Sequence, residues 1–432
     1  MTSNRSRASA PCARARFARA SAVCRNTISS IDISSSRSLA GRRSSSGRAA
    51  RPDGTAVVPP NRPATLTARL AAAFGVFGWW WGAWAASLPA VRRAVAISDA
   101  KLGVVLLAIS VGALPAMMVA GRLADRVGPR LVPLCLAAFA VAGAFPAFAE
   151  SPWVLLVLLL VIGATTGALD IAINARANAI EAAANIRVMD GLHAAFSAGV
   201  VVGGIGAGLA RRAGAHPGAI LLVGSGLVAT AAVVNSHAAK LPSAAAGRAP
   251  LAAQLLFVGG VLAVAFLLES GVETWSALFI ENELGASPAI SGLGPGLFAA
   301  AMVTARLVAQ RRPEASPVGR MRFAGAAGAA GLGLAALAHR PVVALAGFVV
   351  AGLGLAVSAP TLFRVAGRYG AAPAISTVAV LGYLGFVAGP PIFGAVAGAT
   401  SVRGGFVFLC AMAAVLVATV PILRRGEPES RG

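Results

Sequence analysis

The chain has 432 residues, of which 57% are hydrophobic and only 12% are charged. A soluble domain is about half apolar and about a quarter charged, so this composition excludes an ordinary water-soluble domain and favours a protein that faces lipid. The formal net charge of +22 suggests a nucleic-acid partner, but twelve Arg against two Asp in residues 1–62 supply a net ten of those charges. The other basic residues lie mostly in short stretches between apolar runs. They do not form the basic face that binds nucleic acid, and we expect no such partner.

Residues 1–62 are rich in Ser, Arg and Ala and lack an apolar run long enough for a signal peptide. Such a segment cannot bury enough apolar surface to fold. Three interpretations stay open: a disordered cytoplasmic tail, an organellar transit peptide, or a start codon assigned too far upstream. We favour the tail or the misassigned start, because Val57 or Val58 could be read from a GTG codon directly before the first apolar block.

Twelve apolar blocks follow, each near the ~20 residues that cross a ~30 Å hydrocarbon core. Their expected spans are 66–90, 101–121, 131–149, 152–175, 190–210, 217–237, 251–275, 287–309, 321–338, 341–360, 374–398 and 403–423. Strands of a membrane β-barrel would be about half as long and would alternate polar with apolar residues. The blocks therefore predict an all-α membrane protein with twelve transmembrane helices.

The second half of the chain repeats the first. The segment 118–123 reads MVAGRL and the segment 302–307 reads MVTARL, and the same offset of 184 residues relates the first block to the seventh. Two six-helix halves related in this way are a known architecture of membrane transporters, which hold the substrate between the halves. We expect two pseudo-symmetric six-helix bundles at 63–237 and 251–423, a cytoplasmic linker at 238–250 and a cytoplasmic tail at 424–432.

Arg and Lys residues predict the orientation, because cytoplasmic loops carry an excess of them. Alternate loops hold fourteen in one set, which includes Arg306, against seven in the other. Arg211 and Arg212 stand out as a basic pair on the poorer side. The Arg-rich tail joins the richer set, so both termini are expected to be cytoplasmic. The protein is then a multi-pass protein of the cell inner membrane, surrounded by lipid, and we expect a monomer.

The strongest motif is GRLADRVGPR at residues 121–130, between the second and third blocks, which we call the signature loop. Gly121 and Gly128 allow a tight turn and a close helix approach. Asp125 is an anion that can sit at a helix N-terminus or pair with an arginine, and Arg126 and Arg130 flank it in the loop. An ordinary basic loop is the alternative interpretation.

The signature loop resembles the G-x-L-x-D-R-x-G-R-R motif of the major facilitator superfamily, with Pro129 in place of one basic residue. The resemblance implies a secondary transporter whose loop latches the two halves together on the cytoplasmic side. In the second-half copy Ala309 replaces the Asp, so this latch should be one-sided. The run from Trp81 through residues 87–90 (SLPA) to the signature loop is followed by Asp170 and Asn174 and by the segment from Glu269 to Leu278. With these residues the chain is similar, across residues 66–423, to a bacterial subgroup near the rhizopine-transport proteins and fucose permease relatives. It departs from that subgroup at Ser87, where an Arg is expected.

Two pairs of polar residues lie inside apolar blocks. Asp170 and Asn174 are spaced i, i+4, and so are Glu269 and Glu273, so each pair shares a helix face. A carboxylate in the membrane is costly, which makes it a candidate for substrate binding or proton exchange. The two glutamates also repel each other, and taking up a proton would relieve that repulsion.

Structural alternatives accompany each of these candidates. Asp170 and Asn174 could form a structural pair bonded to Arg176 or to loop residues. Glu273 and Trp275 could instead mark the outer interface, where Trp is enriched. His193 could titrate near neutral pH or be a satisfied residue at a helix end.

Aromatic and small residues add weaker signals. Trp80 and Trp84 share a face of the first helix and could stack on a flat ligand such as a sugar ring, with ordinary packing as the alternative. The eleventh block contains residues that favour close helix packing and a kink. These are Gly385, Gly389, Pro390 and Pro391.

No constellation typical of an enzyme or a cofactor protein is present. The cysteines, Cys12, Cys24, Cys135 and Cys410, lack the spacing of metal ligands or of a disulfide framework. A phosphate-binding loop and a nucleophile elbow are also missing. We therefore expect no enzymatic activity, no cofactor and no metal.

The expected function is secondary transport of a small polar organic solute by alternating access, with a sugar-like cargo and proton coupling as working assumptions. The sequence leaves symport and antiport open. A multidrug or cation efflux carrier is the alternative within transport. A non-transporting membrane sensor or scaffold is the alternative from another class.

Overall fold

The computed structural model describes residues 62–236, 253–311, 316–369 and 371–425. The predicted N-terminal tail, apart from its last residue, and the predicted linker at 238–250 lie outside the described residues. The predicted C-terminal tail is shorter than expected, because the last helix continues to Arg425.

Every regular element in this described part of the chain is helical. The long helices of the first half are α2 (Arg62–Ala94), α3 (Asp99–Val127), α4 (Leu131–Gly143), α5 (Pro152–Ala184), α6 (Met189–Arg212) and α7 (Pro217–Asn235). Those of the second half are α8 (Ala253–Leu278), α10 (Leu293–Gln310), α11 (Pro317–Ala336), α12 (Pro341–Leu355), α13 (Ser358–Gly367), α14 (Ala371–Ala399) and α15 (Val402–Arg425). Four short turns complete the described elements: η1 (Gly128–Arg130), η2 (Pro146–Phe148), η3 (Phe279–Glu283) and α9 (Pro288–Ser291).

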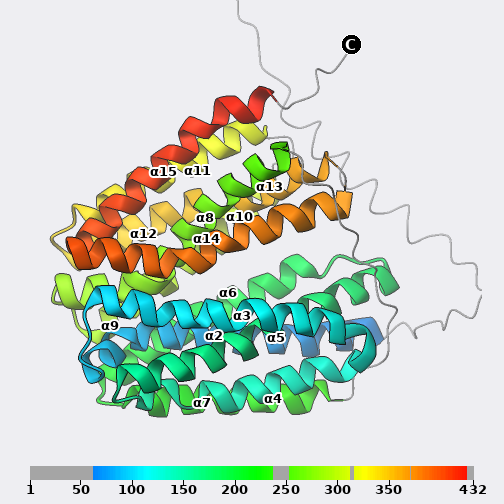
Figure 1. Cartoon of the computed structure of the whole chain (residues 1–432), viewed down its shortest axis with the longest axis horizontal. Coiled ribbons are helices and arrows are strands. Elements are labelled where there is room, and N and C mark those ends of the chain that lie inside the picture. The colour runs from blue at the N-terminus through cyan, green and yellow to red at the C-terminus, as the bar shows by residue number, and fades with distance from the viewer. Residues whose placement is uncertain (1–61, 237–252, 312–315, 370, 426–432) are drawn as a thin grey trace, which may run out of the picture. The chain divides into compact units, whose positions relative to one another are not determined.

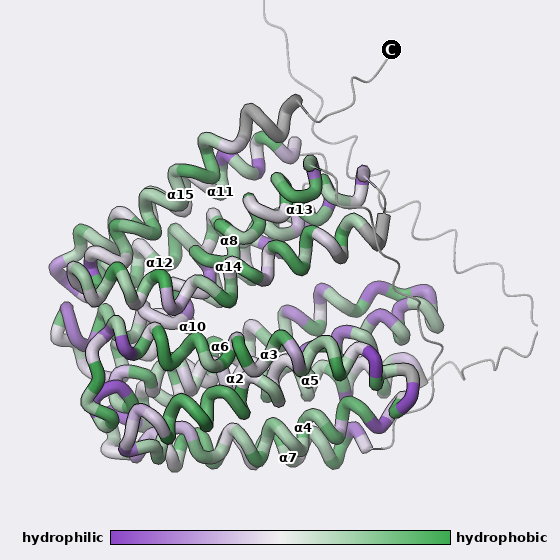
Figure 2. Tube along the Cα trace, viewed as in Figure 1, coloured by the Kyte–Doolittle hydropathy of each residue, from purple (hydrophilic) through white to green (hydrophobic). Residues whose placement is uncertain are grey.

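The prediction of twelve membrane crossings is confirmed. Ten helical segments of the described chain are long and apolar enough to cross a membrane, and α2 and α11 are the two further long helices. One of the ten crossings combines α12 and α13. Hydrophobic residues run along the helices, while hydrophilic residues gather toward the helix ends (Figure 2). This distribution is the one that a lipid solvent selects.

The contacts between helices repeat from one half to the other. In the first half α2 packs on α6, α3 on α5, and α4 on α7. In the second half α8 packs on α14, α10 on α12, and α11 on α15, which are the equivalent pairs under the internal repeat (Figure 1). The halves meet through α3 with α14 and α6 with α10, which are again equivalent pairs. The two-bundle architecture predicted from the MVxxRL repeat is therefore present.

Glycines lie at these contacts between the halves, which also meet through α6 with α9 and α2 with α8. A Cβ on Gly208 of α6 would lie 2.6 Å from the carbonyl oxygen of Pro288, and one on Gly292 would lie 2.9 Å from the Cα of Gly208. At the other contact, a Cβ on Gly103 would lie 2.8 Å from the Cα of Gly394. Only glycine lets the backbones approach this closely. All four glycines lie toward the helix ends opposite the signature loop.

The small residues predicted in the eleventh block lie on α14. A Cβ on Gly385 would lie 1.8 Å from the carbonyl oxygen of Ala263, and one on Gly389 would lie 2.1 Å from the Oγ of Ser270, so both glycines permit close packing on α8. The helix continues through Pro390 and Pro391.

Candidate functional site

The signature loop ends α3 and leads into α4. Gly128 has φ 59° and ψ −133°, a conformation that side-chain-bearing residues rarely adopt. Arg126 and Arg130 are exposed. No described atom lies within 4 Å of the position that a Cβ on Gly121 would occupy, so the close helix approach predicted there is not seen in this conformation. Asp125 belongs to α3, but its side chain lies outside the described part of the structure.

Asp170 and Asn174 form a bonded pair on α5. The Nδ2 of Asn174 donates to the Oδ1 of Asp170 at 3.1 Å and to its backbone oxygen at 2.9 Å. Both residues are half-buried. The alternative pairing with Arg176 is not observed, since the Nη2 of Arg176 is buried without a hydrogen-bond partner among the described residues. From the second half, Tyr383 of α14 lies within electrostatic range of Asp170.

Glu269 is the most deeply buried of the predicted carboxylates. Its residue is 6% exposed, and its Oε2 lies 3.9 Å from the Nη2 of Arg306. That separation is too long for a hydrogen bond. Its Oε1 is buried and has no hydrogen-bond partner among the described residues. Glu273, one helical turn further along α8, is half-buried.

Arg306 was missed as a site residue, because its position after an apolar block resembled that of a loop cation. It lies instead inside a membrane-spanning segment, and its Nε donates to the carbonyl oxygen of Ala356 at 3.4 Å, where α12 gives way to α13. Arg306 is also within electrostatic range of Glu273 and of His193 on α6. One arginine thus connects both candidate glutamates of α8 with a titratable residue of the first half. His193 itself packs edge-to-face on Phe74, with ring centroids 5.4 Å apart.

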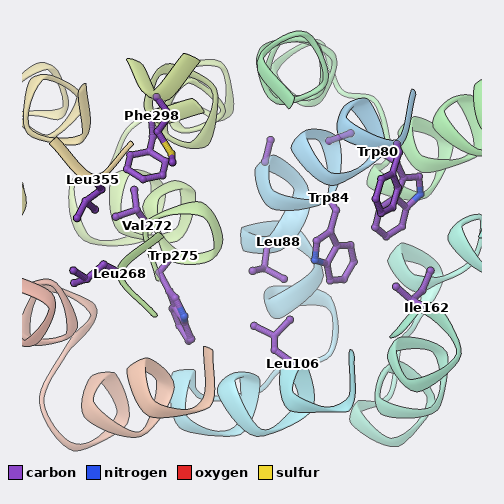
Figure 3. Close-up of a cluster of buried hydrophobic side chains, with 14 of the residues drawn as sticks. Trp80, Trp84, Leu88, Leu106, Ile162, Leu268, Val272, Trp275, Phe298 and Leu355 are labelled. Atoms are coloured by element: carbon purple, nitrogen blue, oxygen red, sulfur yellow. The ribbon is translucent and has the colours of Figure 1, made fainter. Parts of the chain in front are cut away.

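The tryptophans of α2 lie in packed surroundings. Trp80 and Trp84 stack with ring centroids 5.9 Å apart and an interplanar angle of 9°, so they share a face as expected (Figure 3). Trp80 is fully buried, packs edge-to-face on Phe139 of α4, and donates its indole N–H to the Gly143 oxygen at 3.1 Å. These contacts are those of core packing within the first half.

Trp275 does not mark the membrane interface. It is fully buried on α8 and stacks on Phe393 of α14 with centroids 4.7 Å apart. Its indole nitrogen and the Oγ of the adjacent Ser276 are buried without hydrogen-bond partners among the described residues. Together with Glu269, the same stretch of α8 carries three buried polar atoms that the described protein leaves unbonded, and such atoms are rare in native structures.

A second ionic cluster joins the halves at the end opposite the signature loop. Arg211 and Glu281 form a two-bond ion pair: Nη2 to Oε1 at 2.7 Å and Nη1 to Oε2 at 2.9 Å. Arg93 of α2 also donates to Oε1 at 2.7 Å, and Ser291 donates to Oε2 at 2.7 Å. Arg211 additionally donates to the Ala86 carbonyl at 2.6 Å. Arg211 was counted above as a loop cation; the structure buries it in the last turn of α6.

The helical pairing, the repeat and the intramembrane charges define a polytopic membrane protein of the two-bundle transporter class. The sequence profile of the Major Facilitator Superfamily matches residues 69–373. The chain therefore belongs to the Major Facilitator Superfamily and is a membrane transporter, which confirms the family expected from the signature loop.

Relatives are similar over most of their length. A protein described as an uncharacterized MFS-type transporter of Yersinia pestis is 29% identical over 359 residues, which cover 81% of this chain and 93% of that protein. The membrane protein MosC of Rhizobium meliloti is 28% identical over 385 residues, which cover 86% of this chain and 93% of MosC. An uncharacterized transporter of Sinorhizobium fredii is 30% identical over 379 residues, which cover 82% of this chain and 97% of that protein.

Solved structures share the fold at low identity. A mutant of the nucleoside transporter NupG gives a TM-score of 0.66 at 14% identity and covers 83% of this chain and 99% of its own. A bacterial homologue of the human lysosomal transporter Spinster, in an inward-facing and occupied conformation, gives a TM-score of 0.65 at 16% identity. The match covers 86% of this chain and 98% of the homologue. The arrangement of the twelve crossings is therefore that of known transporters.

Proposed function

We propose that this chain is a secondary carrier of a small polar organic solute in the cell inner membrane. It moves its cargo by alternating access and exchanges a proton at Glu269. It acts without a cofactor and without enzymatic chemistry. Both termini face the cytoplasm in this proposal, as the distribution of basic residues indicates.

The observation that carries the proposal is the polar stretch of α8. A buried carboxylate without a hydrogen bond is costly in the membrane, where water cannot compensate it. Glu269 has a cation nearby, yet Arg306 stays at 3.9 Å. A proton on Glu269 would remove its buried charge, and a donor on the cargo would bond the carboxylate oxygen that the described protein leaves unbonded. The spacing of Glu269, Glu273 and Ser276 places all three on one face of α8.

A break in the neighbouring crossing supports a site at this level. Transporter sites near the midplane are typically formed by discontinuous helices, whose free backbone groups bind cargo or ions. Here the crossing of α12 and α13 is interrupted after Leu355, and Arg306 uses the carbonyl of Ala356 at that interruption. Ser358 and Thr361, just beyond it, also carry buried hydroxyls without hydrogen-bond partners in the described chain.

Cation efflux is the second candidate function, because the carboxylates of the candidate site outnumber the arginine beside them. Two carboxylates of α8, Glu269 and Glu273, lie near Arg306, and Asp170 of α5 is a further carboxylate inside a membrane-spanning segment. An amine-bearing cargo would be attracted to these carboxylates.

The first proposal, an uncharged and hydroxyl-rich cargo, agrees with the fold neighbour NupG, which is a nucleoside transporter.

A thermal-shift screen of the detergent-purified full chain separates these candidates. A ligand that binds only the folded protein raises the melting temperature by mass action. Sugars, polyols, nucleosides, amino acids and lipophilic cations should be compared at two pH values, with Glu269→Gln as the variant and Glu283→Gln as the matched control. We expect a hydroxyl-rich ligand to stabilise the wild type in a pH-dependent manner, and Glu269→Gln to lose that pH dependence. Stabilisation by lipophilic cations alone would establish the efflux alternative, and unchanged pH dependence in Glu269→Gln would refute proton exchange there.

A further inference from the structure

We infer that Arg211, Glu281 and Arg93 form a latch that holds the two halves together at the outer end of the transporter and must open once in every transport cycle. We call these three residues the outer latch. The inference takes alternating access from the proposed function, but it needs neither proton coupling nor a particular cargo.

The first argument is that the outer latch crosses between the halves. Arg211 ends α6 and Arg93 lies at the end of α2, both in the first half, whereas Glu281 lies in η3 at the end of α8. The bonded partners Arg211 and Glu281 are 70 residues apart in the sequence. A rocking motion that separates the outer ends of the halves must break these bonds, because no shared helix keeps the partners together.

The second argument is the completeness of the bonding. Each oxygen of Glu281 receives two donors: Arg211 and Arg93 on Oε1, and Arg211 and Ser291 on Oε2. The side chains of Arg211 and Glu281 are only 4% and 7% exposed. A buried, two-bond arginine–carboxylate pair is among the strongest polar contacts in proteins, provided that its geometry is complete. Such a contact favours the state with the outer end closed.

The third argument is the backbone packing beside the latch. Gly208 lies one helical turn before Arg211 and approaches Pro288 and Gly292 within distances that no side chain would tolerate. The outer latch and the glycine contact therefore close the same end of the protein together. This role explains why Arg211 runs against the positive-inside distribution, because Arg211 is buried in the outer latch, whereas Arg212 is exposed.

A nearby ion pair provides a matched control. Glu283 lies two residues after Glu281 and its Oε2 is 3.9 Å from the Nε of Arg403. Both partners belong to the second half, so rocking of the halves leaves this pair intact. Glu283→Gln removes the same charge from the same segment and leaves the ion pair between the halves intact, although it also relieves the repulsion between Glu283 and Asp99 of α3.

The test is the accessibility of a single cysteine behind the outer latch. Ser87 is fully buried on α2, next to Ala86, whose carbonyl accepts from Arg211. Ser87→Cys is introduced into a chain whose four native cysteines are replaced by serine, and labelling by a membrane-impermeant thiol reagent is followed in intact cells and in inverted vesicles. We expect Glu281→Gln to raise the labelling rate from the outer face about tenfold, and Arg211→Lys to raise it less, by shifting the population toward the outward-open state. Glu283→Gln should leave the rate unchanged.

Equal labelling rates in Glu281→Gln, Arg211→Lys and Glu283→Gln would overturn the outer latch and leave these residues a structural role only. An increase seen only in inverted vesicles would overturn its assignment to the outer face. Should Glu281→Gln fail to fold, Arg211→Lys keeps the charge and decides the question alone. The cysteine labelling rate requires no cargo, so its outcome does not depend on the outcome of the ligand screen.

Discussion

Two arginine–glutamate pairs of this transporter lie in membrane-spanning segments and bury their glutamates to a similar degree, but they differ in how completely those glutamates are bonded. Arg211 and Glu281 are joined by two short hydrogen bonds across the halves, and every carboxylate oxygen has its donors. Arg306 and Glu269 stand 3.9 Å apart within one half, and one carboxylate oxygen is left without a hydrogen bond in the described protein. Complete bonding suits a contact that holds a conformation. Incomplete bonding suits a group that exchanges a proton or binds cargo.

Neutralising the two glutamates should have opposite effects on stability, and this is the largest effect that we expect. Breaking a buried, fully bonded pair by removing one partner typically costs about 3–5 kcal/mol. Glu281→Gln should therefore lower the melting temperature of the purified protein markedly. Glu269→Gln removes a buried charge that is poorly compensated, so we expect the melting temperature to stay the same or rise. Equal destabilisation by both variants would remove the distinction between the two pairs.

Filling the glycine contact beside the outer latch should impair transport. A Cβ at Gly208 would lie 2.6 Å from a backbone oxygen, so Gly208→Ala should prevent the outer end from closing and reduce uptake in vesicles strongly. Gly206 on the same helix has nothing within 4 Å of its Cβ position and is the matched control. Gly206→Ala should be neutral or stabilising by up to about 1 kcal/mol, since Ala favours helix. Normal uptake by Gly208→Ala would show that the close contact is dispensable.

The signature loop offers a smaller comparison of two glycines. Gly128→Ala forces a side chain into a backbone conformation that it rarely adopts, which should cost about 1–3 kcal/mol and reduce the yield of folded protein. Gly121→Ala meets open space and should leave the melting temperature unchanged in the conformation described here. A close approach to α3 in the opposite state would make Gly121→Ala slow transport without changing the melting temperature, so measuring both quantities on this variant separates the two effects.

The sequence predicted the fold well because lipid imposes a simple rule. A crossing needs about twenty apolar residues, and the blocks therefore mark each crossing, although α3 continues to Val127 and α5 to Ala184, well beyond their predicted ends at 121 and 175. The MVxxRL repeat and the glycine turn at Gly128 were likewise readable, since both depend on local sequence. Helical spacing predicted that Asp170 and Asn174 share a face, and the structure adds the hydrogen bond between them.

The partners of the ionic groups could not be predicted in the same way. Arg211 finds Glu281 through the packing of two halves, and Arg306 finds Glu269 through the packing of two helices. Neither pairing leaves a local pattern. One signal was present nonetheless: Arg211 contradicted the positive-inside distribution, and a basic residue that runs against that distribution is a candidate for burial with a carboxylate.

In the proposed division of labour, Glu269 exchanges a proton and Glu281 does not. Infrared difference spectroscopy of the purified chain, titrated across the neutral pH range, measures the carbonyl band of protonated carboxylic acids directly and needs no cargo. We expect a titrating band that loses one component in Glu269→Gln and persists in Glu281→Gln. A band unchanged in Glu269→Gln, or lost in Glu281→Gln, would contradict the division of labour between the two pairs.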